Sequence, residues 1–348
     1  MKKVKVLVTG GTGYIGAHTA VELNSAGYDV LLVDNFSNSS PDVLAGIEKI
    51  TGRRSLFEEV DCADYSAFKL LFEKHPDVGA AIHFAAYKAV GESVEKPLMY
   101  YKNNLFSLIN LIELMTQQGK SSIVFSSSCT VYGQPSKENL PVGESAPLQP
   151  AVSPYGRTKQ MSEDILEDSA RAYKEKLNVI LLRYFNPIGA HPSALIGELP
   201  KGTPQNLLPY ITQTAAGLRD VLNVYGNDYS TPDGSCIRDY IYVCDLAKAH
   251  VAAMDRLLDK AAEMKDNIEY FNLGTGKGLS VLELIALFQK ATGVTVPYRI
   301  TGRRAGDVEQ VWADPSLANK VLGWSASTSV EDTLLSAWNW EKKIRGII

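Results

Sequence analysis

Short apolar runs alternate with amphipathic stretches through the first half of the chain. The apolar runs lie at 4–9, 28–34, 56–60, 80–84, 122–126 and 178–183. A run at 14–25 has helical spacing and is closed by Gly27, and helical stretches also precede the strands at 80–84 and 122–126. Continuous apolar strands separated by helices predict a parallel sheet that is covered on both faces. The first half is therefore predicted to be α/β, a doubly wound parallel sheet with right-handed crossovers.

The pattern changes after Phe185, where prolines and glycines interrupt it. Helical patterns return at 207–217, 245–258, 280–292 and 330–343. Short strands are expected at 222–225, 240–243, 270–273 and 297–300. This second half is predicted to be a smaller α/β domain that binds the substrate. The expected domain bounds are 1–186 and 187–348, and the segment 240–275 is a candidate to rejoin the first sheet.

Bulk properties indicate an ordinary globular protein. At 348 residues the chain exceeds the size at which one core usually stops growing. Its net charge of −4 gives no general attraction to nucleic acid or to an anionic membrane, and no apolar run approaches the roughly 18 residues of a membrane span. The apolar start runs straight into a glycine loop, so we interpret it as a strand and not as a signal peptide. Four cysteines without CxxC or metal-ligand spacing predict free thiols, no metal and a cytoplasmic location.

Glycines follow the first strand in the order Gly10, Gly13 and Gly16, which is a GxxGxxG spacing. Residues without a side chain allow a sharp turn from strand to helix, and the first helical amides can then hold a pyrophosphate. Tyr14 and Ile15 belong to that first turn and are candidate contacts as well. Because the loop stands between a clear strand and a clear helix, it predicts a dinucleotide site.

A carboxylate at the end of the second strand bears on which dinucleotide binds. Asp34 is expected to accept hydrogen bonds from both ribose hydroxyls and to repel a 2′-phosphate, so NAD is favoured over NADP. Asn35 shares this turn, and a solvated turn without ligand is the alternative for both residues. Asp61, after the third strand, and Cys62 beside it are candidates near the adenine. Asp61 could equally cap the next helix.

Tyr155 and Lys159 stand one turn apart on a helix that is expected to begin at Pro154, with Ser153 as its cap. A phenol with a pKa of about 10 is a poor base at neutral pH. A nearby ammonium and a positively charged nicotinamide both favour the phenolate, which makes the phenol a usable base. Ser128, just beyond the fifth strand, can share the proton of a substrate hydroxyl. These side chains predict redox chemistry on an alcohol.

Further motifs run nearly from end to end of the chain: Gly10–Gly16, His83–Ala86, Lys88–Ser93, Asn103–Asn104, Ser126–Gly133, Tyr155–Lys159, Arg183–Pro187, Asn206–Tyr210, Arg238–Tyr240 and Arg303–Asp307. Together they resemble the extended short-chain dehydrogenase/reductases, and specifically the UDP-glucose 4-epimerase family. The resemblance implies an NAD-binding Rossmann fold, tightly bound NAD that is not consumed, and interconversion of UDP-glucose and UDP-galactose in galactose metabolism. C4 of the sugar would be oxidised, the 4-keto sugar would rotate, and the same carbon would be reduced on its other face.

The resemblance also assigns residues to both ligands. Those expected to line the cofactor are Phe84, Ala85, Lys88, Asn103, Ser128, Tyr155, Lys159 and Tyr184. Those expected to contact the UDP-sugar are Lys88, Ser128, Tyr155, Asn186, Asn206, Leu207, Tyr225, Arg238, Arg304, Asp307 and Val311. Arg238 and Arg304 would bind the diphosphate, because a guanidinium fork suits phosphate oxygens. Asp307 would bind a ribose or sugar hydroxyl, and Tyr225 would pack near the uracil.

Two further expectations rest on the family likeness and keep an alternative. Val311 stands where some relatives carry a tyrosine against the sugar, so UDP-N-acetylglucosamine is a further expected substrate. The alternative is a core valine whose size reflects neighbouring packing. A homodimer is expected through helices near 97–118 and 153–174, although the apolar faces of these helices could instead only cover the sheet.

Three rival functions share part of this pattern. A nucleotide-sugar 4,6-dehydratase needs an acid and a base just before the Val-Tyr-Gly turn, where this chain has Cys129 and Thr130. A net dehydrogenase would exchange its cofactor in every turnover. A non-catalytic NAD-binding protein would not need both Tyr155 and Lys159, and this chain has both. The epimerase is therefore the favoured interpretation.

Overall fold

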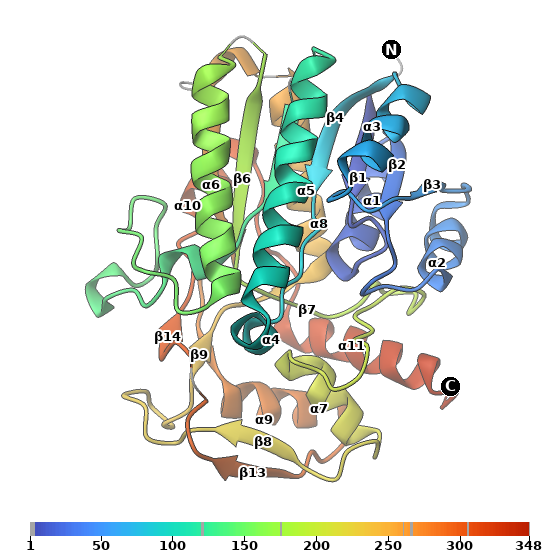
Figure 1. Ribbon diagram of the computed structural model, residues 1–348. Coiled ribbons are helices and arrows are strands. Elements are labelled where there is room, and N and C mark those ends of the chain that lie inside the picture. The colour runs from blue at the N-terminus through green and yellow to red at the C-terminus, as the bar shows by residue number, and fades with distance from the viewer. Residues whose placement is uncertain are drawn as a thin grey trace.

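The computed structural model describes residues 4–119, 122–174, 176–259, 261–264, 267–304 and 306–347. A seven-stranded sheet with helices on both faces forms the larger part, and a smaller region lies beyond the carboxyl ends of its strands (Figure 1). The predicted doubly wound α/β fold is confirmed. The exact domain bounds stay a prediction. Within the described ranges, no helix is long and apolar enough to cross a membrane.

All neighbouring strands of the large sheet are parallel. From one edge to the other they are β11 (Ile268–Leu273), β6 (Asn178–Tyr184), β5 (Ser122–Ser126), β4 (Val78–His83), β1 (Lys5–Thr9), β2 (Asp29–Asp34) and β3 (Leu56–Glu59). The strand order reverses between β1 and β4, which is where ligands bind in sheets of this kind. β11 comes from the segment 240–275 and pairs with β6 at the edge.

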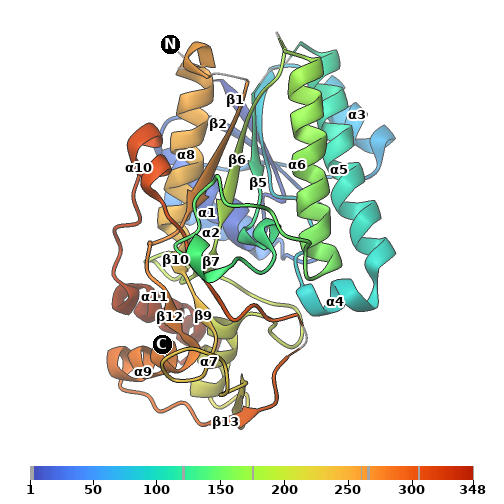
Figure 2. The ribbon, with the colours of Figure 1, turned by 90° about the vertical axis from the view of Figure 1, so that its left-hand side faces the viewer.

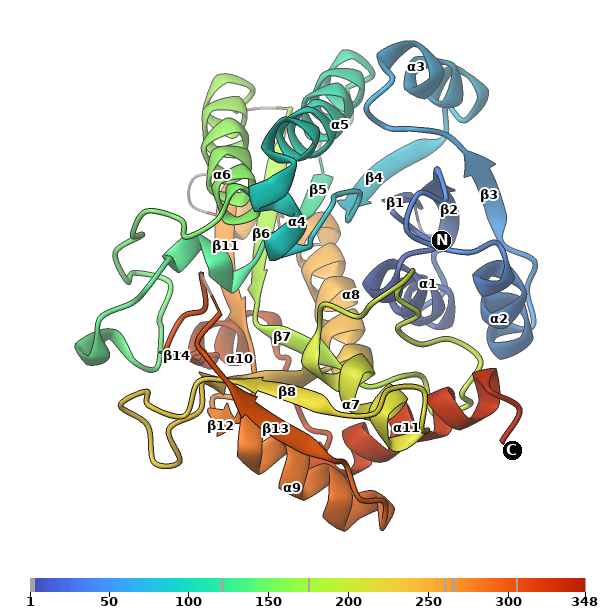
Figure 3. The same cartoon turned by 60° about the horizontal axis from the view of Figure 1, so that its bottom comes forward.

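The two faces of the sheet are covered by different helices (Figures 2 and 3). One layer contains α1 (Tyr14–Ser25), α2 (Asp42–Thr51), α8 (Val243–Asp259) and α10 (Ser316–Leu322). The other contains α3 (Tyr65–Lys74), α5 (Pro97–Gln117) and α6 (Pro154–Ala172), with the short α4 (Val90–Glu95) leading into α5. Along β1, Val6 and Val8 pack towards the first layer and Leu7 towards the second. Because both faces are buried, the strands read as continuous apolar runs.

The smaller region has a core of its own around Leu208, Ile211, Leu284, Phe288 and Leu334. Its helices are α7 (Leu207–Ala215), α9 (Val281–Thr292) and α11 (Val330–Ile344). Its strands form small sheets that pair β8 (Leu222–Tyr225) with β13 (Tyr298–Thr301), β7 (Asn186–Ile188) with β10 (Tyr240–Tyr242), and β9 (Ile237–Arg238) with β12 (Leu279–Ser280) and β14 (Gln310–Val311). This region lies opposite the carboxyl edge of the large sheet (Figure 1).

Candidate active site

The loop after β1 turns sharply because two of its glycines meet other backbone closely. Gly10 has a φ of +66°, and a Cβ there would lie 2.9 Å from the backbone nitrogen of Ala85, just after β4. A Cβ on Gly16 would collide with the carbonyl oxygen of Gly10. Glycine is therefore required at Gly10 by the approach of the backbone after β4, and at Gly16 by the approach of α1 to this turn.

The start of α1 presents backbone groups to the carboxyl edge of the sheet. Gly13 precedes the helix with an extended backbone and has no side chain with which to cap it. The side chains of the first turn point elsewhere: the Tyr14 hydroxyl donates to the carbonyl of Gly189 at 2.7 Å, and Ile15 is buried in the core. The first amides of α1 therefore form a candidate site for a pyrophosphate.

The Asp34 carboxylate, at the end of β2, lies directly beside this loop. One of its oxygens accepts a hydrogen bond from the Thr12 amide at 3.2 Å. The other accepts from the Phe36 amide at 2.9 Å and from the Ser39 hydroxyl at 3.0 Å. The Asn35 side chain accepts from the amide two residues on, at 3.0 Å. The structure thus brings the predicted carboxylate and the glycine loop together, while the assignment of Asp34 and Asn35 to a ribose stays a prediction.

The loop after β3 corrects one alternative. The Asp61 side chain accepts from the Ala63 amide at 2.8 Å and so closes a local turn. The cap of α3 is instead Asp64, whose carboxylate accepts from the Ala67 amide at 3.1 Å. The alternative of Asp61 as a helix cap is therefore wrong, because the helix begins later in the chain. Cys62 is buried beside Asp61, and the proximity of both to an adenine stays a prediction.

Helix α6 begins where the sequence predicts. Pro154 occupies its first turn, and the Ser153 hydroxyl accepts a hydrogen bond from the Gly156 amide at 3.1 Å. The helix then places Tyr155 and Lys159 one turn apart on its buried side, where they are 7% and 4% exposed. Both side chains therefore face the sheet and not the solvent.

The three candidate catalytic side chains meet at the end of β5. The Lys159 ammonium donates to the Ser126 carbonyl oxygen at 2.5 Å and lies 4.7 Å from the centre of the Phe125 ring. The Ser128 hydroxyl, two residues further on, lies beside the Tyr155 phenol and lowers its pKa. Since β4 alone separates β5 from β1, this cluster stands close to the glycine loop at the same edge of the sheet.

Burial opposes the charged forms of both ionisable groups in this cluster. It raises the pKa of the Tyr155 phenol well above its ordinary value, and the hydrogen bond with Ser128 acts in the opposite direction. Burial also lowers the pKa of Lys159 to about 7, and the nearby Glu163 carboxylate opposes that fall. Near neutral pH the Lys159 ammonium is thus close to losing its proton.

The other residues that the resemblance assigns to the cofactor lie around this edge. Phe84 and Ala85 follow β4, Lys88 precedes α4, Asn103 lies in α5 and Tyr184 ends β6. The Tyr184 hydroxyl is 2.6 Å from the Ser126 hydroxyl. The Lys88 ammonium forms an ion pair with Glu198 at 3.0 Å, and the Asn103 amide donates to the neighbouring asparagine at 3.0 Å. Tyr184 thereby joins the catalytic strand end directly.

Two arginines and a carboxylate from the smaller region form a second group. Arg304 donates to the Asp307 carboxylate at 2.8 Å, and Arg238, in β9, has its Nη2 4.0 Å from the same oxygen. The Arg304 guanidinium also lies 5.6 Å from the centre of the Tyr225 ring, which is 40% exposed. The structure therefore brings Arg238, Arg304, Asp307 and Tyr225 together, as a nucleotide site would require. Their assignment to a diphosphate, a hydroxyl and a base stays a prediction.

The remaining substrate candidates lie in two places. Asn206, directly before Leu207 and α7, donates to Glu198 at 2.6 Å, which is the carboxylate that also pairs with Lys88. Asn186 begins β7, and its backbone N–H donates to the backbone carbonyl of Asp239 at 2.9 Å. Glu198 thus links a cofactor candidate to a substrate candidate, although sequence reasoning gave it no role.

Val311 lies next to Arg238 in the pairing of β14 with β9. It is 5% exposed and belongs to a small apolar cluster with Val131, Phe185 and, more loosely, Cys129. Since Cys129 follows Ser128 in sequence, this cluster lies directly behind the catalytic turn. The position fits a wall of the sugar site and equally fits the alternative of a packed core valine.

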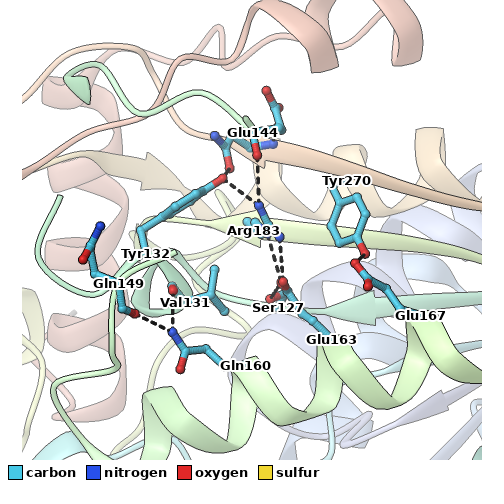
Figure 4. A network of polar contacts seen from close by, with 11 residues as sticks. Ser127, Val131, Tyr132, Glu144, Gln149, Gln160, Glu163, Glu167, Arg183 and Tyr270 are labelled. Atoms are coloured by element: carbon cyan, nitrogen blue, oxygen red, sulfur yellow. Dashed lines mark hydrogen bonds and ion pairs between the residues drawn. The ribbon is translucent and has the colours of Figure 1, made fainter. Parts of the chain in front are cut away.

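Sequence reasoning missed a buried polar network next to the catalytic side chains Tyr155 and Lys159. Figure 4 shows this network. Glu163, in α6, accepts hydrogen bonds from the Arg183 guanidinium at 3.0 and 2.7 Å and from the Ser127 hydroxyl at 2.5 Å. The signal that could have found it is the regular spacing of Tyr155, Lys159 and Glu163, which recur every four residues on one side of the helix.

The described part of the chain contains no group of three or more His, Cys, Asp or Glu side chains that could hold a metal ion. The candidate chemistry carried by side chains lies in the phenol, the ammonium and the serine at the strand end. The arginine group of the smaller region supplies the positive charge that a diphosphate needs.

Comparison with known proteins agrees with this geometry. A family model described as GDP-mannose 4,6 dehydratase matches residues 7–336. UDP-glucose 4-epimerase of Bos taurus is 49% identical over 345 residues, covering 97% of each chain. The structure of UDP-glucose 4-epimerase from Bifidobacterium longum in complex with NAD+ and UDP matches with a TM-score of 0.93 and 46% identity, covering 99% of this chain and 100% of that one. The UDP-Glc/GlcNAc 4-epimerase of Campylobacter jejuni matches with a TM-score of 0.82 and 37% identity, covering 98% and 100%. The chain belongs to the UDP-glucose 4-epimerase family.

Proposed function

We propose that this protein is an NAD-dependent epimerase that interconverts UDP-glucose and UDP-galactose at C4 of the sugar. The observation that carries the proposal is the meeting of Tyr155, Lys159 and Ser128 at the sheet edge that also holds the glycine loop. It occurs in a chain that is 49% identical to a curated UDP-glucose 4-epimerase over 97% of its length. The fold, the charged groups and the family thus support the same reaction.

The residues of this chain fit NAD. A side chain on Gly10 or Gly16 would collide with nearby backbone, so the turn can exist only with a bare backbone that a pyrophosphate can approach. The first amides of α1 would hold the pyrophosphate, Asp34 the adenosine ribose, and Lys159 the nicotinamide ribose. When bound, NAD supplies the two-electron acceptor and donor for C4 and a positive charge that favours the ionised phenol.

Tyr155 acts as the base in this proposal. Its phenol takes the proton of the sugar 4-hydroxyl, which Ser128 orients. The Lys159 ammonium is fixed on the Ser126 carbonyl and favours the phenolate by its charge. The same phenol returns the proton to the sugar oxygen once the sugar has turned. Because the reaction has no net redox change, the cofactor has no need to leave.

Inversion at C4 requires a firmly held nucleotide and a loosely held sugar. Arg238 and Arg304 converge on Asp307, which fixes the direction of both guanidinium groups. We assign these two arginines to the diphosphate, because two charged forks on one anion give strong and directional binding. The hexose would then turn about its bonds to the anchored diphosphate and present its other face to the catalytic side chains.

The test is to incubate the purified protein with UDP-galactose and without added cofactor. We expect UDP-glucose to accumulate, and we expect about one NAD per chain in the supernatant of denatured protein. Stoichiometric release of reduced cofactor would instead indicate a net dehydrogenase. Absence of turnover until NAD is added would contradict tight cofactor binding.

A 4,6-dehydratase is a second candidate because the matching family model carries that description. Elimination of water needs an acid and a base near C5 and C6 of the sugar. Where those groups would stand, this chain has Cys129 and Thr130, and burial raises the pKa of the Cys129 thiol to about 11. Such a thiol is a poor base at neutral pH, so the epimerase is favoured. A 4-keto-6-deoxy sugar in the assay would reverse this conclusion.

We also propose that the sugar site admits a 2-acetamido group. Val311 is small, and its cluster lies behind the Ser128–Cys129 turn. The related structure from Campylobacter jejuni carries the name UDP-Glc/GlcNAc 4-epimerase, which places this activity within the family. Assays with UDP-N-acetylglucosamine test the proposal directly.

A homodimer is our further proposal. On α5, the side chains of Leu98, Phe106 and Ile109 are 73%, 52% and 40% exposed, and their spacing places them along one side of the helix. Exposed apolar side chains in a row favour a protein contact, and α6 lies beside α5 (Figure 2). Light scattering should give twice the mass of one chain. The variant Phe106→Glu should shift that mass towards the monomer.

The cell compartment is proposed from the cysteines. Cys62, Cys129, Cys236 and Cys244 are all free thiols, which favours a reducing cytoplasm. Fractionation of the source cells, with detection of the protein in each fraction, tests this proposal.

A further inference from the structure

Three titratable side chains of α6 form one buried row. Tyr155, Lys159 and Glu163 recur every four residues and are 7%, 4% and 3% exposed. The row runs along the buried side of the helix, and Figure 4 shows its third member, Glu163, beside Ser127 and Arg183. The proposed reaction uses the first two members, whereas the third has no role in it.

The same row meets three consecutive serines at the end of β5. The Lys159 ammonium donates to the carbonyl of Ser126, and Ser128 lies beside the Tyr155 phenol, whose pKa it lowers. Between them, the Ser127 hydroxyl donates to Glu163 at 2.5 Å. Each serine therefore lies against one member of the row, and Ser126 and Ser127 are hydrogen-bonded to it. The middle bond fixes how far this strand end lies from the helix.

Glu163 is itself held in place by a buried ion pair. The Arg183 guanidinium, in β6, donates to both carboxylate oxygens at 3.0 and 2.7 Å, and Arg183 is only 5% exposed. Arg183 also donates to the Tyr132 hydroxyl at 3.0 Å, which in turn donates to Asn272 of β11 at 2.7 Å. The carboxylate is thereby tied to three neighbouring strand ends and has a single orientation.

Stability alone gives a weak reason for such a pair. A buried ion pair contributes little net stability, because the loss of hydration offsets the attraction, and well-packed apolar residues often replace it without loss. What an apolar pair could not provide is an acceptor for the Ser127 hydroxyl. Glu163 also opposes the effect of burial on the Lys159 ammonium. The hydrogen bond to Ser127 acts next to Ser128, and the charge of Glu163 acts on Lys159, so Glu163 affects two members of the proposed catalytic cluster.

We propose that Glu163 is a positioning residue: through Ser127 it holds the end of β5 so that Ser128 and Lys159 keep their places around Tyr155. This inference rests on the proposed epimerase function, because it assigns a role in that reaction. It predicts that loss of Glu163 or Ser127 lowers kcat and leaves the affinity for the nucleotide unchanged. The reason is that, in the described hydrogen bonds, Ser127 and Glu163 contact neither Arg238 nor Arg304.

The test compares Ser127→Ala with Tyr270→Phe. Ser127→Ala removes the hydroxyl and leaves both Arg183–Glu163 bonds in place. Tyr270→Phe is the matched control, because it removes a different hydroxyl bond to α6, that to Glu167, one turn further from the cluster (Figure 4). We expect Ser127→Ala to lower kcat roughly tenfold, as part of the ~10²-fold that a misplacement of about 1 Å can cause. KM for UDP-galactose and the rates of the control should stay at the parent values.

A double variant, Glu163→Met with Arg183→Met, provides the stronger measurement. It removes the whole ion pair without leaving a buried charge, so it avoids the main reason for misfolding. We expect kcat to fall by about 10²-fold with KM unchanged, measured on protein whose thermal transition shows that it is folded.

Three outcomes would overturn the inference. One is a folded double variant with the kcat of the parent, and another is a loss confined to KM. The third is an equal loss in Tyr270→Phe, which would mean that loosening of α6 in general explains the effect. The parent protein distinguishes this from a failure of the proposed function: if the parent does not epimerise UDP-galactose, the function is wrong, whatever the variants do.

Discussion

The catalytic edge and the nucleotide region differ in how their functional side chains are held. At the catalytic edge, Tyr155 and Lys159 are almost wholly buried, and the Lys159 ammonium is hydrogen-bonded to the backbone at the end of β5. In the nucleotide region, the Arg304 side chain is 45% exposed and forms an ion pair with the carboxylate of Asp307. The first group is fixed by the fold, whereas the second is fixed mainly by its own members.

This difference fits the two tasks in the proposed reaction. Proton transfer at C4 needs atoms placed to within a fraction of an ångström, which a buried strand end and helix can provide. Binding of a diphosphate needs charge and access from solvent, and a sugar that must turn cannot be held rigidly. We therefore expect substitutions at the edge to lower kcat, and substitutions in the nucleotide region to raise KM.

The largest effect is expected at the edge. Tyr155→Phe keeps the ring and removes the oxygen that accepts the C4 hydroxyl proton, so kcat should fall by about 10³-fold or more. Bound NAD should be unchanged, because the ring still fills its buried place. The measurement is the turnover of UDP-galactose together with the NAD content per chain. Turnover at the parent rate would remove the basis of the proposed mechanism.

The buried ammonium should give the protein a characteristic pH dependence. An unfolded lysine has a pKa of about 10.4, whereas burial lowers that of Lys159 to about 7. Between these values the unfolded chain binds more protons than the folded one, so this group makes the free energy of unfolding rise with pH. Lys159→Met lacks the effect. Between about pH 7 and about pH 10, the free energy of unfolding of the parent should therefore rise by on the order of a few kcal/mol relative to that of the variant.

Denaturant unfolding of both proteins across this range measures the difference. A difference that stays flat would mean that Lys159 keeps its proton throughout. In that case its charge is stabilised more strongly than burial and Glu163 together indicate.

The nucleotide region is tested by Arg304→Met, with Arg303→Met as the matched control. Arg303 is the preceding residue, is similarly exposed, and pairs with Asp228 at 2.8 Å instead of Asp307. Loss of a charged hydrogen bond to the diphosphate should raise KM by about tenfold to a hundredfold with little change in kcat. Equal effects of the two substitutions would mean that general positive charge, and not the placement of Arg304, binds the nucleotide.

The sequence predicts the large sheet well because its signals are local and long. Strands buried on both faces read as continuous apolar runs, and the start of α6 is set by Ser153 and Pro154. The short strands β7, β9, β12 and β14 were not predicted, because two or three residues are too few to show a period. The helices α2 and α10 also went unassigned; they are short, with ten and seven residues, and few of those residues are fully buried.

The candidate site divides in the same way. Tyr155, Lys159 and Ser128 could be predicted because one helix and one strand end carry them, and their meeting follows from the topology. The spacing of Glu163 marks its side of the helix but not its partner Arg183, 20 residues away, and nothing local indicates the contact of Glu198 with Lys88, 110 residues away. No local pattern reports such pairs, and only the packed fold brings them together.

The smallest effect tests the boundary between the two regions. Val311 lies beside Arg238 in β14 and also packs behind the catalytic turn, so it belongs to both. If it is a wall of the sugar site, Val311→Tyr should lower kcat/KM for UDP-N-acetylglucosamine by about tenfold or more and leave UDP-galactose near the parent value. If it is only a core residue, the larger ring disturbs the cluster, and both substrates should lose activity alike along with some stability. The ratio of the two kcat/KM values therefore separates the two interpretations, because damage to packing cancels from it.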